Sequence, residues 1–266
     1  MSMSIEDHSD GGGGIMNSNK KANNNTETDN YDFELRPEDI GLLQLSDSFF
    51  PTGMYTMSNG LEALFYSEKK KLISNPDDLL NLIKTFIENQ IGPADCAALG
   101  VAYEQIIKNN LSKLIEVDNI IFSMKLVEEI RNASSRSGTQ LLRCVASFVT
   151  DHTLMNEYLK AVSSKKATGV FPVALAVSAH SLGIPRNKAA LIMLYGFTVS
   201  MVGAALRMGM LQHFDGQMII HRLRNTLVST IRSNIDRPLT GIWQFAPGID
   251  LIQISHEKML SKMFIT

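Results

Sequence analysis

Apolar residues recur every three or four positions along most of the chain, which is the spacing of one face of an α-helix. The clearest run is 79–87, with apolar residues at 79, 80, 82, 83, 86 and 87. Asn75 is placed to cap this helix, and Pro76 suits its first turn. The glycine–proline pair that begins at Gly92 is expected to end it.

The same spacing predicts further helices over 94–108, 119–134, 139–149, 170–182, 189–206, 217–232 and 251–263. Gly183, with a proline two residues later, is a stop signal after the helix at 170–182. No alternating run is long enough to predict a strand, and no repeat is evident. The sequence therefore predicts an all-α fold, a single-domain helical bundle of about eight to ten helices over residues 36–266. Residues 1–35, rich in glycine and asparagine, are expected to form a disordered N-terminal tail.

The run at 189–206 is apolar and long enough to raise the question of a membrane span. It contains several small and polar residues, and the rest of the chain offers neither a second span nor an aromatic belt. We therefore expect a buried central helix and no membrane association. Gly196, Ser200 and Ala204 form a stripe of small residues on one face. Such a stripe permits close helix packing, either within the domain or across a dimer.

Composition narrows the class of protein. The 266 residues are 44% hydrophobic and carry a formal net charge of −2, so no basic field points to nucleic acid. Cys96 and Cys144 lie far apart and form no CxxC pair, which excludes a disulfide framework or zinc finger and suits a reducing compartment. The first 30 residues contain no apolar core of a signal peptide. A cytoplasmic protein is expected.

Candidate chemistry is sparse. The sequence has no P-loop, no GxSxG, no HExxH and no GxGxxG after a predicted strand, so no enzyme class or cofactor is indicated. His213, Gln217 and His221 fall on one helix face, but the two histidines are too far apart to chelate one ion. No metal site is predicted. The acidic pair Glu128 and Glu129 is expected to be solvated.

One segment carries a specific motif. Residues 42–62 read LLQLSDSFFPTGMYTMSNGLE, which resembles the N-terminal signature of the UreF family, an LLQL helix followed by P-x-G-x-[FY]-x-x-S-x-GLE. The resemblance spans about residues 40–266. It continues at Glu129, Arg131, Ser134, Gly138, Leu141 and Leu142, then at Arg207, Asp215, Gly216 and Gln217, and finally at Pro247, Asp250, His256 and Glu257.

The resemblance implies a fold and a role. Members of this family are all-helical, dimeric and not known as enzymes, so a homodimer without cofactor is expected. They join the accessory protein UreD, called UreH in some organisms, and recruit the GTPase UreG, which they have been discussed as regulating. The assembly delivers nickel to the urease apoprotein in a GTP-dependent way.

The resemblance also assigns residues. Glu62 matches a carboxylate implicated in coupling to UreG, and Arg207 matches a basic position on the same surface. The remaining assignments are Tyr55, Ser58 and Gln217 on the GTPase side, His256, Lys262 and Phe264 on the UreD side, and Pro51, Gly53 and Gly60 as shape-determining residues of the motif. An intramolecular ion pair between Glu62 and Arg207 is the alternative explanation for that pair.

The sequence departs from the family pattern at two places. Residues 211–213 read LQH where the family often has LGQ, and residues 262–266 read KMFIT where it often has R-L-F-x-S. Residues 250–266 are expected to be frayed in the free protein and to become ordered on UreD. Two other functions stay open from the residues alone: a helical adaptor unrelated to urease, and a metal-dependent helical enzyme.

Overall fold

A computed structural model describes residues 35–67 and 73–266, and every regular element within these ranges is a helix. The prediction of an all-α fold is confirmed. The tail predicted at 1–35 lies outside the described residues except for its last position. The α-helices are α1 (Pro37–Ser46), α2 (Leu61–Tyr66), α3 (Pro76–Phe86), α4 (Ala97–Ile107), α5 (Leu111–Met124), α6 (Glu128–Ala146), α7 (Thr153–Ser163), α8 (Phe171–Ser181), α9 (Arg186–Arg207), α10 (His213–Asn234) and α11 (Pro247–Glu257). Short helices η1 (Met54–Thr56) and η4 (Leu239–Gly241) and the π-helix η3 (Ile87–Cys96) complete the set.

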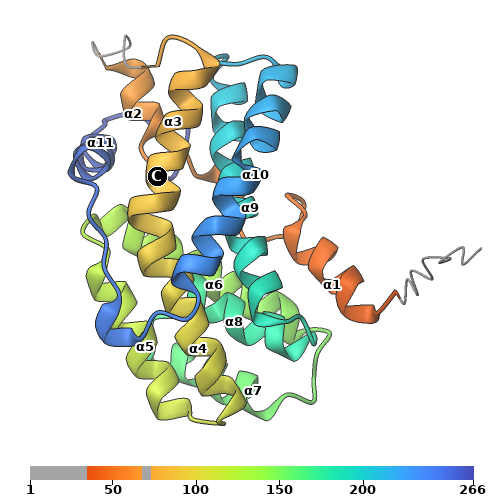
Figure 1. Ribbon diagram of the computed structural model, residues 1–266. Coiled ribbons are helices and arrows are strands. Elements are labelled where there is room, and N and C mark those ends of the chain that lie inside the picture. The colour runs from red at the N-terminus through yellow and green to blue at the C-terminus, as the bar shows by residue number, and fades with distance from the viewer. Residues whose placement is uncertain (1–34, 68–72) are drawn as a thin grey trace, which may run out of the picture. The chain divides into compact units, whose positions relative to one another are not determined.

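The apolar helix α9 lies alongside α10 (Figure 1) and contacts elements from most parts of the described chain. By length and composition it could cross a membrane, yet 67% of its most apolar window is buried inside the structure. Helices α1, α4, α8 and α10, together with η1 and η3, pack against it. These contacts explain its composition, because a helix covered on most sides by other helices is apolar nearly all round. They support the interpretation of α9 as a buried central helix.

The small-residue stripe of α9 is used inside the molecule. The Ser200 hydroxyl donates to the backbone carbonyl oxygens of Met54 (2.8 Å) and Met57 (3.2 Å). A Cβ added at Gly196 would lie 3.8 Å from the Met54 side chain, and Ala204 is fully buried. The small-residue stripe therefore packs against η1 and the residue that follows it. It no longer supports a dimer interface on this face of α9.

The helix that was expected to end at Gly92 continues. Helices α3, η3 and α4 follow one another without a break, and Pro93 lies inside the π-helical turn. A proline removes one backbone donor, and a widened π-turn is a common way for a helix to absorb such an irregularity. Gly92 serves close packing instead, because a Cβ there would lie 2.4 Å from Thr230 of α10. The predicted helix end was wrong.

The helix predicted over 119–134 is also wrong, since two helices meet within it. Between α5 and α6 the backbone of Lys125 is extended, and its Nζ lies 2.7 Å from Oδ1 of the buried Asp95. The Arg131 guanidinium donates to the carbonyl oxygens of Lys125 (2.7 Å) and Leu126 (2.8 Å). These two hydrogen bonds give partners to carbonyl groups at and just beyond the end of α5. The helix predicted over 139–149 is the second half of α6.

A buried carboxylate organises the turn that leads into α8. Asp118 is fully buried and accepts hydrogen bonds from the Tyr158 hydroxyl (2.7 Å) and the Thr168 hydroxyl (2.7 Å). The backbone N–H groups of Thr168, Gly169 and Val170 also donate to it. Burial, together with the charge of Asp118, holds the pKa of Tyr158 well above its ordinary value. This turn fixes where α8 begins, and Gly183 ends that helix in the left-handed conformation (φ 72°), as predicted.

Candidate functional site

The signature segment forms a tight loop between α1 and α2. Gly53 and Gly60 have φ of 80° and 91°, which is the left-handed region that favours glycine. Gly60 has a second constraint, because a Cβ there would lie 2.9 Å from Ile252 of α11. Pro51 lies exposed in the bend before η1. These residues shape the loop and allow α11 to approach the start of α2.

Glu62, in the first turn of α2, is 2% exposed and points toward the end of the chain. Its carboxylate accepts the backbone N–H groups of Met263 (2.7 Å) and Phe264 (3.0 Å). It also lies 3.1 Å from Nε2 of His256 on α11. Burial works to raise the pKa of Glu62, but these three donors outweigh burial and hold the pKa below its ordinary value.

His256 connects this carboxylate to a second one. Its ring is fully buried, and Nδ1 lies 2.7 Å from Oε2 of Glu129 on α6. The other oxygen of Glu129 lies 2.7 Å from the Lys262 ammonium group, which also donates to the Glu257 carbonyl oxygen at 3.2 Å. We call Glu62, Glu129, His256 and Lys262 the four-residue cluster. It joins α2, α6 and α11 to residues 258–266, the C-terminal segment.

Backbone hydrogen bonds dock the C-terminal segment onto the signature loop. The N–H of Ser58 donates to the Thr266 carbonyl oxygen (2.8 Å), and so does the Ser58 hydroxyl. The N–H of Asn59 donates to the Thr266 hydroxyl (3.2 Å), and the N–H of Ile265 donates to the Thr56 carbonyl oxygen (2.8 Å). The segment is non-helical, so the helix predicted to reach residue 263 ends at Glu257. The expectation that 250–266 is frayed in the free protein was wrong, because the segment is packed onto its own chain.

Arg207, in the last turn of α9, lies between two aromatic rings. Its guanidinium carbon is 3.8 Å from the ring centre of Tyr55 and 4.5 Å from that of Phe264. Its Nε donates to the Gly203 carbonyl oxygen at 3.0 Å. The alternative of an ion pair between Glu62 and Arg207 was wrong: Phe264 contacts both residues, Glu62 through its backbone N–H and Arg207 through its ring.

The structure gathers most of the residues that the resemblance assigned to two separate partner surfaces. Gln217 lies exposed on α10 and is not brought into these contacts. Sequence reasoning missed Glu129, which was expected to be solvated; its place in the family pattern was the one available signal. The residues that share one continuous set of contacts are Tyr55, Ser58, Glu62, Glu129, Arg207, His256, Lys262 and Phe264.

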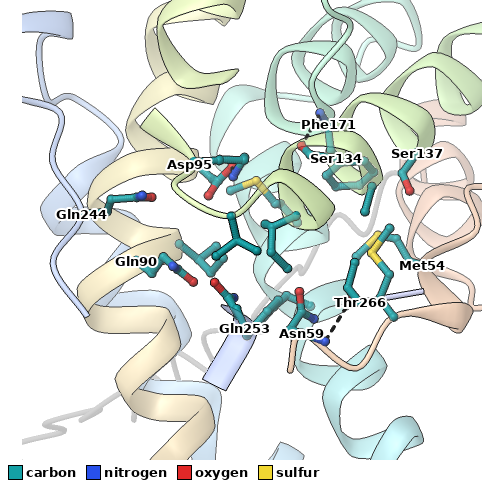
Figure 2. Close-up of a pocket in the computed structure, with 18 of the residues that line it drawn as sticks. Met54, Asn59, Gln90, Asp95, Ser134, Ser137, Phe171, Gln244, Gln253 and Thr266 are labelled. Atoms are coloured by element: carbon teal, nitrogen blue, oxygen red, sulfur yellow. Dashed lines mark hydrogen bonds and ion pairs between the residues drawn. The ribbon is translucent and has the colours of Figure 1, made fainter. Parts of the chain in front are cut away.

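A cavity with about 780 Å³ of empty space, part of it open to solvent, lies beside the docked segment. Figure 2 shows Thr266, Asn59 and Met54 on the side away from Asp95 and Gln244. The lining is mostly apolar, and Oδ2 of Asp95 has no hydrogen-bond partner in the described part of the chain. Among residues 35–67 and 73–266, no three histidine, cysteine or acidic side chains are grouped to hold a metal ion.

We expect Arg207→Lys to lower the free energy of unfolding by about 1 kcal/mol, because an ammonium group cannot stack its plane between Tyr55 and Phe264. Urea titration followed by circular dichroism measures the change. Arg224→Lys, at an exposed position on α10, is the matched control and should change stability by no more than about 0.5 kcal/mol. Equal stability of both variants and the parent would show that the stacking contributes nothing.

Comparison with known proteins agrees with the resemblance noted in the sequence. Residues 73–224 match the family model UreF. The chain is 30% identical over 227 residues to the urease accessory protein UreF of Trichodesmium erythraeum, covering 85% of this chain and 96% of that protein. It is 27% identical over 227 residues to UreF of Bacillus sp. strain TB-90, covering 85% and 98%. It is 25% identical over 229 residues to UreF of Haemophilus influenzae strain Rd, covering 86% and 96%.

The family-model match begins after α2 and ends within α10, so it includes Glu129 and Arg207 but not Glu62 or His256. The full-length relatives extend the similarity over most of the remaining chain. Together with the all-α fold, these matches show that the chain belongs to the UreF family.

Proposed function

We propose that this chain is a urease accessory protein of the cytoplasm that acts as a scaffold and catalyses no reaction itself. In this role it binds UreD (UreH) and the GTPase UreG and assists GTP-dependent insertion of nickel into the urease apoprotein. Nickel is the cargo of the assembly. The names of the relatives support this function over a helical adaptor unrelated to urease.

The observation that carries the proposal is the docking of the C-terminal segment on the signature loop. Two motifs of the family, about 200 residues apart in the chain, are held together through the buried Glu62 and the half-buried Arg207, both of which contact Phe264. A surface built from buried hydrogen bonds is held in one geometry, which lowers the entropy cost of binding a partner. Such a preorganised surface suits a scaffold.

Exposed apolar side chains on the C-terminal segment support its assignment to UreD. Leu260 is fully exposed, Met263 is 60% exposed and Ile265 is 37% exposed, although the segment's backbone is hydrogen-bonded. Unbranched methionine adapts to an irregular partner surface, and buried apolar anchors supply most of the affinity of an interface. We assign these three residues to contact with UreD.

On the side assigned to the GTPase, Tyr55 is 60% exposed and the half-buried Arg207 stacks on its ring. Gln217 on α10 lies exposed and is available to the same partner. The homodimer remains part of the proposal on the strength of the family resemblance alone, because the small-residue stripe is occupied by η1.

The experiment is co-expression of the chain with its cognate UreD, UreG and urease. Leu260→Asp should reduce co-purified UreD at least about tenfold, because a carboxylate in an apolar interface is costly, while the helical signal stays unchanged. Ile107→Asp is the control, since Ile107 is 66% exposed at the far end of α4. Sedimentation of the co-purified assembly gives its copy numbers.

Urease activity in the same cells supplies the functional measurement. Activation should fall with Leu260→Asp and persist with Ile107→Asp. If Leu260→Asp retains UreD at the parent level, the interface lies elsewhere. If neither UreD nor UreG co-purifies with the unaltered chain, the scaffold function itself is rejected.

A further inference from the structure

Both ring nitrogens of His256 face carboxylate oxygens. Nδ1 lies 2.7 Å from a carboxylate oxygen of Glu129, and Nε2 lies 3.1 Å from one of Glu62. An ionised carboxylate only accepts hydrogen bonds, so each ring nitrogen must carry a proton to form both contacts. A neutral imidazole has one N–H, and its second nitrogen would direct a lone pair at an anionic oxygen. With both carboxylates ionised, the form that satisfies both contacts is the imidazolium ion.

Each element packed around His256 brings a charged side chain to the ring or to one of the carboxylates that contact it. Helix α2 supplies Glu62, α6 supplies Glu129, and the C-terminal segment supplies Lys262, whose Nζ lies 2.7 Å from Glu129. On α11 itself, Glu257 accepts the backbone N–H of Glu129 at 3.2 Å. Arg207 of α9 faces Phe264 rather than the imidazole.

The four-residue cluster is balanced when the ring is charged, with two carboxylates against two cations. Loss of the ring proton leaves one negative charge in excess at a place where the Glu62 side chain is 2% exposed and that of Glu129 is 15% exposed. An uncompensated charge in such surroundings is strongly destabilising. The pKa of Glu62 is held below its ordinary value despite burial, because Met263, Phe264 and His256 donate to it, so Glu62 does not take up the proton in the neutral range.

We propose that His256 is the positioning residue of the C-terminal segment, and that it holds this segment docked as an imidazolium ion, so that docking weakens when a rise in pH removes one of its two ring protons. Loss of either ring proton breaks a contact with Glu62 or with Glu129, and both residues also bind the C-terminal segment directly. That a partner binds to this surface rests on the proposed function, but docking of the C-terminal segment is a property of the chain alone.

The charge of the ring is measured directly by nitrogen NMR of the full chain labelled in its histidines, with His256→Gln identifying the signals of this residue. We expect both ring nitrogens of His256 to carry protons at about pH 6.5. A neutral tautomer at that pH would overturn the proposal.

Docking is measured by hydrogen exchange of residues 258–266, expressed as protection relative to the intrinsic rate at each pH. Between about pH 6 and pH 8.5 the protection of this segment should fall about 10- to 100-fold, the loss expected for a hydrogen bond to a charged group. Protection of α9 should stay constant. Protection of the segment that is equal at both pH values would overturn the proposal.

Glu129→Gln provides the matched variant. The amide group of glutamine donates to Nδ1 of a neutral ring and keeps an oxygen for Lys262, so docking no longer requires the imidazolium ion. Protection in this variant should be the same at both pH values. A decrease as large as that of the parent chain would overturn the proposal, and if the variant does not fold, the two measurements on the parent chain decide the question.

Co-purification of UreD at the same two pH values separates this inference from the proposed function. If protection of the C-terminal segment decreases as the pH rises but UreD binding does not, His256 keeps its role and the assignment of the segment to UreD is wrong. If protection does not fall, the role of His256 is wrong whatever the partner does.

Discussion

Glu62→Ala is expected to release the C-terminal segment and to lower the free energy of unfolding by about 3 kcal/mol. The substitution removes the acceptor of two backbone N–H groups and one ring nitrogen, and it leaves the charge of His256 with one partner instead of two. Hydrogen exchange should show loss of protection at residues 263–265, and urea titration gives the change in stability. Co-purification of UreD should be lost with it.

The effect of Glu62→Ala should depend on pH. Because the pKa of Glu62 is lowered in the folded chain, its contribution is fully present above the ordinary value of 4.5 and is lost as the pH falls through the lowered pKa. The difference between parent and variant is therefore full in weakly acidic solution above that value and shrinks in stronger acid. Glu128→Ala, an exposed carboxylate at the start of α6, is the control and should show no such dependence. A variant as stable as the parent at neutral pH would contradict the structural role of Glu62.

Gly100→Ala is expected to destabilise the protein by about 3 kcal/mol. A Cβ at this position of α4 would lie 2.0 Å from the carbonyl oxygen of Ile235, at the end of α10. The obstacle is backbone rather than a flexible side chain, so α4 and α10 must move apart. Thermal and urea unfolding measure the loss.

Gly203→Ala on α9 is the matched control, because no atom lies within 4 Å of the added Cβ. There the substitution should stabilise the protein by up to about 1 kcal/mol, through the better helix propensity of alanine. Similar effects of the two substitutions would show that close approach of the helices at Gly100 does not limit stability.

Local signals in the sequence predicted local structure. The start of α3 follows from Asn75, whose side chain accepts the Asp78 backbone N–H at 3.0 Å, and from Pro76 in the first turn. The end of α8 at Gly183 follows from the preference of that residue for positive φ. Each of these features depends on residues only a few positions apart.

Features that depend on distant residues were not predicted. The chain bends at Lys125 because its ammonium group meets Asp95, thirty residues earlier, and periodicity carries no information about that contact. Pro93 was interpreted by its usual effect on an isolated helix, whereas the π-turn is accommodated among helices packed around it. In each case tertiary contacts outweighed local preference.

In the candidate site, too, the contacts between residues far apart in the chain were not predicted. The family resemblance singled out Glu62 and Arg207, but the ion pair considered between them does not form. The true partners, His256 and Phe264, come from the end of the chain, and their geometry depends on how α11 lies against α2. Glu129 was missed because the acidic pair of Glu128 and Glu129 was expected to be solvated. Only Glu128 is exposed, and sequence alone does not show which of two adjacent carboxylates points inward.

The hydrogen bonds between the signature loop and the C-terminal segment join residues 207 and 208 positions apart. During synthesis, proteins fold as the chain emerges from the ribosome, N-terminal parts first. The loop at 53–60 therefore waits for its hydrogen-bonding partners until residue 266 has left the ribosomal exit tunnel. A nascent or prematurely terminated chain can form its helical core and still lack the docked surface. Under the proposed function, such a chain would therefore lack the surface that binds a partner.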